Sequence, residues 1–280
     1  MRLISQDQII ATVKDLCIQS HCVLRCDTVQ ALRAAKQKEQ SPQGREVIDL
    51  LLQNAALACK EMIPFCQDTG YAVLFVELGQ DVRLDGNLVE ILNEGVRQGY
   101  RDGYLRMSIL DDPIHRVNTG DNTPAVIHFN LVPGNEMKIS LLVKGCGCDN
   151  RSAIKMLTPA EGLAGAKAFI LETIEMAGPN ASPPFVIGIG MGGPFAQAAW
   201  LAQKALLWPI GKPNLNPVYQ KLELELLAEI NQLGIGPAGM GGTVTALGLH
   251  IEYGPTHIAS FPVAVNIDCH SHRGKEAYVE

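Results

Sequence analysis

Two cysteines that are far apart in the chain lie in similar polar surroundings, and they place the strongest constraint on the fold. Cys66 lies in residues 64–70 (PFCQDTG) and Cys269 in residues 266–273 (NIDCHSHR), each after an apolar stretch. A thiolate is a strong ligand for soft metals, and polar neighbours tune its pKa and can orient a bound substrate. We therefore expect both cysteines to be ligands of one metal or iron–sulfur site, so the fold must bring these two segments together.

Composition and charge narrow the class of protein. With 47% apolar and 19% charged residues, the 280-residue chain is typical of a globular protein with a sizeable core. Its net charge of -6 gives no electrostatic reason to bind nucleic acid or an anionic membrane. Apolar runs stay shorter than the roughly 18 residues of a transmembrane helix. The first residues become polar too soon for a secretory signal peptide, which favours the cytoplasm. There the eight cysteines are expected to be reduced thiols, some of them metal ligands.

Helix-like and strand-like hydrophobic periodicities alternate along the chain, which predicts an α/β (α+β) fold. Apolar residues at helical spacing predict helices over residues 5–20, 27–38, 44–63, 85–106, 151–157, 160–178 and 194–207, with a last helix ending near residue 233. Apolar, β-rich runs predict strands over residues 71–78, 124–133, 137–143, 185–190, 243–252 and 261–267. Gly134-Asn135 predicts a hairpin between the second and third of these strands. Since no linker separates the segments, we expect a single domain over residues 1–280, with mixed β-sheets surrounded by helices.

A glycine motif at residues 188–193 (GIGMGG) matches the dinucleotide-binding pattern G-x-G-x-x-G between a strand and a helix. That function also requires a second strand that ends in an acidic residue about 20 residues later. The corresponding segment, residues 209–216 (PIGKPNLN), is neither strand-like nor acidic. We therefore interpret the glycines as a tight strand–helix turn with close backbone packing rather than as a nucleotide site.

Two further loops carry residues that can bind an anion or a substrate. Residues 144–152 (KGCGCDNRS) join a predicted strand to a predicted helix, and glycines there allow the backbone to approach a carboxylate. Residues 118–123 (NTGDNT) can either turn the chain or present polar groups to a substrate. Arg106, at the end of a predicted helix, is by default a solvated charge but is able to clamp a carboxylate.

Four motifs occur in an order that resembles class I fumarate hydratases, the oxygen-sensitive iron–sulfur hydro-lyases, and the related L-tartrate dehydratases. These motifs are residues 66–70, residues 118–123, residues 155–162 (KMLTPAEG) and the segment around Cys269. The likeness extends from about residue 5 to the last residue. The chain resembles the α subunit of the two-subunit form, because it ends shortly after Cys269, whereas single-chain members continue into a further domain.

The resemblance implies a [4Fe-4S] cluster that is held by three cysteines and has one iron without a protein ligand. That iron acts as a Lewis acid on the substrate's oxygen atoms. Cys66 and Cys269 match two of the cluster positions. A β subunit that supplies the remaining catalytic groups, and dimerisation through this chain, are also implied. The positions that match substrate-contacting or catalytic residues of similar enzymes are Gln67, Asp68, Arg106, Gly145, Gly147 and His257, with Asp68 and His257 as the catalytic candidates.

The third cluster cysteine of the family is replaced in this chain. It normally precedes a Pro-Pro pair, but Ser182 stands before Pro183-Pro184 here. A serine hydroxyl is a harder ligand with a much higher pKa than a thiol, so it binds iron–sulfur clusters poorly. Conversely, Cys146 and Cys148 lie in the loop where the family has a Gly-Gly-Gly-Ser run. Either Cys146 or Cys148 replaces the missing ligand, or the cluster is altered, labile or absent. Alternatively, both cysteines are small fillers of a tight loop, and a redox-active pair is a third, less favoured alternative.

These features predict a hydro-lyase that reversibly adds water to a small unsaturated dicarboxylate. Conversion of fumarate to malate is favoured, because residues 118–123 and 155–162 are more similar to fumarases than to tartrate dehydratases. Tartrate and a methylated fumarate are alternative substrates. Two other classes stay open: a non-catalytic homologue that has lost its cluster ligand, and a mononuclear zinc enzyme. Retention of the substrate-contacting set argues against the first, and the lack of a local zinc-ligand pattern argues against the second.

Overall fold

The computed structural model describes residues 2–280, which divide into two compact units. Unit 1 contains the described residues up to Arg25 together with Ala55–Gly145 and Arg273–Glu280, and unit 2 contains Cys26–Asn54 and Cys146–His272. Each unit has a mixed four-stranded sheet and its own helices, so the predicted α/β class is confirmed. The assignment of residues 1–280 to one domain stays a prediction.

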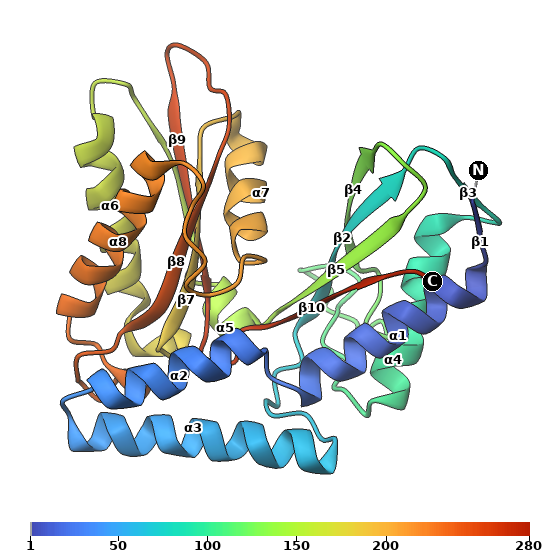
Figure 1. Ribbon diagram of the computed structural model, residues 1–280, viewed down its shortest axis with the longest axis horizontal. Coiled ribbons are helices and arrows are strands. Elements are labelled where there is room, and N and C mark those ends of the chain that lie inside the picture. Colours follow the sequence, from blue (N-terminus) through green and yellow to red (C-terminus); the bar gives the residue numbers. More distant parts are fainter. Residues whose placement is uncertain (1) are drawn as a thin grey trace. The chain divides into compact units, whose positions relative to one another are not determined.

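The sheet of unit 1 has the strand order β10-β5-β2-β4 (Figure 1). Its strands are β2 (Tyr71–Gly79), β4 (Val126–Val132), β5 (Met137–Lys144) and β10 (Arg273–Tyr278). β5 is antiparallel to both β10 and β2, whereas β4 is parallel to β2. The short strands β1 (Arg2–Ile4) and β3 (Val82–Leu84) form a separate parallel pair.

The helices α1 (Gln6–Cys22) and α4 (Leu88–Asp102) pack against each other in unit 1. α1 begins with a capping box, in which Ser5 and Gln8 satisfy N–H groups of the first turn. The apolar faces of both helices share a core of buried aliphatic residues with the sheet, and Tyr100 is the largest side chain in it. Burial of these faces contributes more to helix stability than intrinsic helix propensity does.

The hairpin predicted at Gly134-Asn135 is wrong. β4 and β5 follow each other in sequence, but β2 lies between them and pairs with both. The amide of Asp81, just after β2, donates to the carbonyl of Gly134 at 2.9 Å, so the end of β2 reaches the turn itself. A parallel pair such as β2–β4 needs a crossover connection, which α4 supplies here. Turn residues alone cannot indicate that a third strand will separate their neighbours.

The sheet of unit 2 has the strand order β6-β9-β7-β8 (Figure 1). Its strands are β6 (Ala153–Leu157), β7 (Phe185–Met191), β8 (Ala246–Tyr253) and β9 (Phe261–Asp268). β9 is antiparallel to β6 and β7, and β8 is parallel to β7. The helices α6 (Gly162–Ala177) and α8 (Pro217–Gln232) pack on one face of this sheet and α7 (Phe195–Ala205) on the other.

Unit 2 also contains helices and turns outside these layers. They are α2 (Cys26–Lys38), residues 42–54 of α3 (Pro42–Glu61), α5 (Cys146–Asp149) and the 3-10 turns η1 (Gly178–Ala181) and η2 (Pro237–Gly239).

The helix predicted over residues 151–157 is wrong, because β6 occupies this stretch and pairs with β9. β10, which follows the Cys269 segment, was not predicted. The other predicted helices agree with α1–α4 and α6–α8 to within a few residues. Among residues 2–280, no helix combines the length and the apolar character that crossing a membrane requires.

The glycines of the GIGMGG motif serve close packing, as predicted. A Cβ added at Gly188 would lie 2.1 Å from the carbonyl oxygen of Ala202, and one at Gly190 would lie 2.0 Å from that of Ala198. Both oxygens belong to α7, so only glycine allows this helix to lie directly on β7.

Candidate functional site

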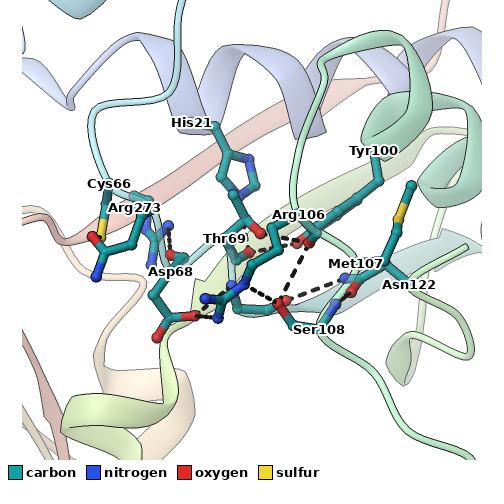
Figure 2. Close-up of polar contacts among 12 residues, drawn as sticks. His21, Cys66, Asp68, Thr69, Tyr100, Arg106, Met107, Ser108, Asn122 and Arg273 are labelled. Carbon is teal, nitrogen blue, oxygen red and sulfur yellow. Dashed lines mark hydrogen bonds and ion pairs between the residues drawn. The ribbon is translucent and has the colours of Figure 1, made fainter. Parts of the chain in front are cut away.

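Residues 64–70, which connect α3 to β2 in unit 1, are held by hydrogen bonds at Thr69 (Figure 2). The Thr69 carbonyl oxygen accepts a hydrogen bond from the hydroxyl of Tyr100 at 2.8 Å. Thr69 Oγ1 donates to the backbone carbonyl of Arg106 at 2.7 Å. Because Tyr100 is fully buried in the core of unit 1, these contacts fix the segment at the point where β2 begins.

Gly70 sets the course of the chain after this segment. Its φ is 55°, a left-handed conformation that side chains rarely adopt. A Cβ at this position would lie 2.2 Å from the carbonyl oxygen of Lys144 at the end of β5. The Gly70 carbonyl oxygen also accepts a hydrogen bond from the side-chain amide of Asn122 at 3.2 Å. Glycine is therefore required here for both the backbone angle and the close approach to β5.

The carboxylate of Asp68 and the guanidinium of Arg106 point toward each other (Figure 2), and 3.4 Å separates Oδ1 from Nη2. The amide of Gly70 donates to the same Oδ1 at 3.0 Å, and Arg106 Nε donates to the hydroxyl of Ser108 at 3.2 Å. The Arg106 side chain is 59% exposed, and the hydrogen bonds that it donates come from Nε and Nη2. An exposed pair of this kind contributes little to stability. The guanidinium is thus oriented yet accessible, as a carboxylate clamp requires.

Arg273 completes this group, although no motif in the sequence pointed to it. Arg273 is 3% exposed, and its Nη1 donates to the backbone carbonyl of Asp68. A Cβ added at Gly145 would lie 3.0 Å from Nη2 of Arg273 and 3.1 Å from Oδ2 of Asp68. Unit 1 therefore brings Asp68, Arg106, Arg273 and Gly145 together. The only available hint was that Arg273 ends the polar segment around Cys269.

Cys66 and Gln67 precede Asp68 on the same segment. Cys66 is half-buried and Gln67 is exposed, and 3.7 Å separates the Cys66 Sγ from the Gln67 Oε1. Cys66 and Gln67 therefore lie in unit 1, next to Asp68 in the chain. Cys269 belongs to unit 2, so the expected convergence of Cys66 and Cys269 stays a prediction.

His21 of α1 supports the segment from within the core of unit 1. Its Nδ1 lies 2.7 Å from the carbonyl oxygen of Cys17, and its Nε2 lies 3.0 Å from that of Thr69. Burial and the positive charge of Arg273 lower the pKa of His21 to about 4, and they outweigh the two carbonyl oxygens, which act to raise it. The ring is therefore neutral at neutral pH.

In unit 2, Cys148, Asp268 and Cys269 each place a donor atom within 4.8 Å of the other two. The Cys148 Sγ lies 3.4 Å from the Asp268 Oδ1. Cys148 and Asp268 are buried, and Cys269 is half-buried. Two thiols beside one carboxylate form a donor set that suits soft or borderline metals.

A compact turn surrounds Cys269. The amide of Cys269 donates to Asp268 Oδ1 at 3.1 Å, and the Cys269 Sγ lies 2.9 Å from the hydroxyl of Ser271. His272, which is fully buried, lies with Nδ1 2.7 Å from Asp268 Oδ2, and its amide donates to the Cys269 carbonyl at 3.0 Å. These contacts fix the turn and hold the carboxylate of Asp268 beside Cys269.

The other candidates for the third ligand, Ser182 and Cys146, differ in their position relative to the Cys269 turn. The carbonyl oxygen of Ser182 accepts a hydrogen bond from the amide of His270 at 3.3 Å, and Ser182 is exposed. Cys146 and Gly147 are also exposed, and Cys146 is not part of the three-residue donor group. Unit 2 therefore brings Cys148 and Cys269 together, with the backbone of Ser182 alongside.

His257 lies elsewhere in unit 2. It precedes β9, whereas Cys269 follows the last residue of this eight-residue strand, which spans roughly 25 Å. Figure 1 shows the two ends of β9 at opposite ends of the sheet. His257 is exposed, and its Nδ1 accepts a hydrogen bond from the amide of Ala259 at 3.1 Å. A single copy of unit 2 does not bring His257 to Cys269, and its catalytic role stays a prediction.

Comparison with known proteins identifies the family of the chain. A family model described as "Fumarate hydratase (Fumerase)" matches residues 10–278. A Methanocaldococcus jannaschii protein with the provisional name L(+)-tartrate dehydratase subunit alpha is 38% identical over 254 residues, which cover 88% of this chain and 89% of the relative. The L(+)-tartrate dehydratase subunits alpha of Escherichia coli strains UTI89 and K12 are 36% and 35% identical over 251 residues, which cover 88% of this chain and 82% of theirs. The chain therefore belongs to the fumarate hydratase (Fumerase) family, a family of hydro-lyases.

Proposed function

We propose that this chain is the α subunit of an iron–sulfur hydro-lyase that reversibly hydrates fumarate to malate together with a β subunit. The observation that carries the proposal is the group around Asp68 in unit 1. There the oriented but accessible guanidinium of Arg106 and the glycine Gly145 lie beside the carboxylate of Asp68, whose segment also carries Cys66. A small dicarboxylate needs a cationic clamp, and the guanidinium of Arg106 supports this role.

The donor chemistry of the chain fits a [4Fe-4S] cluster. Cys66 and Cys269 would hold it, with a third ligand from the residues that border the Cys269 turn. Thiolates are the ligands that such clusters use, and unit 2 alone presents two thiols beside each other. When bound, the cluster supplies an iron that polarises substrate oxygen atoms without a redox change.

In this proposal, each of the chain's own residues in the site has a role. Arg106 binds one substrate carboxylate through Nη1 and Nη2, because its Nε is already fixed by Ser108. Asp68, whose carboxylate is held by the amide of Gly70, orients the substrate hydroxyl. The backbone of Gly145 and Gly147 receives the second carboxylate. Proton transfer at the substrate carbon falls to a residue of the β subunit.

Tartrate is the second candidate substrate, because the relatives described above are named L(+)-tartrate dehydratase subunit alpha. Tartrate and malate, the product of fumarate hydration, both carry a hydroxyl on the carbon next to a carboxylate. The clamp formed by Arg106 and Asp68 therefore suits either substrate, and a methylated fumarate is a third option.

The test is a substrate panel with the α and β subunits purified together without oxygen. We expect fumarate to be consumed and malate to form, and we expect neither subunit alone to do this. Turnover of tartrate but not of fumarate would select the second candidate. A complex with full iron and sulfide content that converts none of these acids would contradict the hydro-lyase proposal. Native mass spectrometry of the same preparation tests the α–β assembly and dimerisation through the α chain.

A further inference from the structure

We infer that Cys148 replaces the thiol missing at position 182 and is the third cysteine ligand of the metal site; this inference rests on the proposed function and deepens it. Cys148 and Cys269 come from different elements, α5 and the turn after β9, yet their sulfur atoms lie within 4.8 Å of each other. Two thiols that approach so closely in one unit can bind a common soft-metal group.

The surroundings of the three candidate residues separate them. Cys148 is 3% exposed and faces Asp268, whereas Cys146 is exposed and lies outside the donor group. The two cysteines are two positions apart on one helical turn, so their side chains do not share a face. Ser182 borders the Cys269 turn through its carbonyl oxygen but offers only a hard hydroxyl.

Cys148 and Ser182 therefore border the same turn, and this common location explains how one residue can take over the role of the other. The amide of His270, next to Cys269, donates to Ser182, while the Asp268 carboxylate on the other side of Cys269 lies against Cys148. The thiol of Cys148 lies close to that of Cys269, and position 182 borders the same turn through its backbone. Of these two positions, only 148 carries a thiol in this chain.

The place of Cys148 is set by contacts that do not involve its thiol. The side-chain amide of Asn266 in β9 donates to Oδ1 of Asp149 at 2.9 Å and to the hydroxyl of Ser152 at 3.0 Å. These bonds attach α5 and the residues after it to the strand that leads to Cys269. A thiol loses its proton when it binds a metal, so metal binding would replace the hydrogen bond from Cys148 to Asp268.

The experiment uses the full chain purified with its β subunit without oxygen and reconstituted with iron and sulfide. After desalting, we expect Cys148→Ser to retain at least tenfold less iron and sulfide per chain than the wild type, with loss of the broad visible absorbance of a cluster. Cys146→Ser, on the same helical turn, is the matched control and should keep the wild-type content. In the double variant Cys148→Ser/Ser182→Cys, a thiol returns to the Cys269 turn, and the content should recover.

Circular dichroism and the melting temperature of the metal-free proteins report on folding, and the double variant keeps the test decisive if the single variant is less stable. Wild-type iron and sulfide content in Cys148→Ser would overturn the inference, as would a wild-type protein that binds one zinc ion and no sulfide. Failure of the proposed function is a separate result. A cluster that depends on Cys148 in a complex without dicarboxylate turnover would support the ligand and contradict the hydro-lyase.

Discussion

The Nδ1 atom of His272 lies 2.7 Å from the Oδ2 atom of Asp268, and both side chains are buried. The other oxygen of Asp268 accepts hydrogen bonds from the amide of Cys269 and from the thiol of Cys148. One buried carboxylate therefore contacts a histidine, the thiol of Cys148 and the backbone amide of Cys269. Hydrogen-bonded carboxylates of this kind orient neighbouring metal ligands.

The change Asp268→Asn tests this connection. It keeps the size of the side chain but removes its charge and replaces one acceptor oxygen with a donor, so the contact to His272 or the contact to Cys148 must exchange its donor and acceptor. We expect the affinity for the metal to fall by roughly 10- to 100-fold, measured by competition with a chelator. Asp15→Asn, at an exposed position of α1, is the control and should leave the affinity unchanged. Equal affinities for wild type and Asp268→Asn would show that the carboxylate has no orienting role.

Arg106→Gln tests the carboxylate clamp. Loss of a charge-assisted hydrogen bond typically costs about 1.5–3 kcal/mol, so we expect kcat/KM for the dicarboxylate to fall roughly 10- to 100-fold, mainly through a higher KM. Arg101→Gln is the matched control, because Arg101 is 63% exposed and pairs with its neighbour Asp102. Kinetics of the α–β complex should separate the two variants. An Arg106→Gln enzyme with unchanged KM would exclude the clamp.

Gly70→Ala tests the required glycine at the start of β2. Gly162 has the same φ of 55°, but a Cβ there would meet nothing within 4 Å, whereas a Cβ at Gly70 would lie 2.2 Å from the Lys144 carbonyl oxygen. We expect Gly162→Ala to lower the free energy of unfolding by about 1 kcal/mol, the usual cost of the left-handed conformation. Gly70→Ala should cost at least about 2 kcal/mol more in urea unfolding. Equal losses would mean that β5 yields to the added methyl group.

His21 predicts a dependence of stability on pH. Its folded-state pKa of about 4 lies below the ordinary value of 6.5. Above pH 6.5 the ring is neutral in both the folded and the unfolded state, so its titration does not change the free energy of unfolding there. As the pH falls toward 4, the unfolded chain takes up a proton that the folded chain excludes, and stability decreases by roughly 2–3 kcal/mol at pH 4.5.

Urea unfolding of wild type and His21→Gln at pH 7 and pH 4.5 measures this contribution. The wild type should lose roughly 2–3 kcal/mol more than the variant over this interval. His115→Gln, at an exposed position, is the control and should follow the wild type. Parallel pH dependences of wild type and His21→Gln would place the titration in another group.

Hydrophobic periodicity was sufficient to predict the long helices, because an amphipathic face is written into residues three and four positions apart. The strands β6 and β10 could not be predicted in this way. Residues 273–278 (RGKEAY) are polar and low in β-branched residues, yet all six pair with β5. Their conformation is imposed by the partner strand, a tertiary effect that outweighs local propensity.

The sequence likewise identified only part of the candidate site. Asp68, Arg106 and Gly145 were identified from the sequence, and unit 1 brings them together. Arg273 was not identified, because its contact with Asp68 depends on the pairing of β10 with β5. The position of His257 beyond the far end of β9 was equally invisible, because it depends on the length and direction of that strand.

The sequence by itself determined which groups are available: a thiol is missing at Ser182, and two others are present at Cys146 and Cys148. Only the tertiary structure decided that Cys148 faces Cys269 while Cys146 faces solvent. The reason is geometric. Two residues that are two positions apart on a helical turn point in different directions, and only the attachment of α5 to β9 determines which of them points toward the metal-binding group.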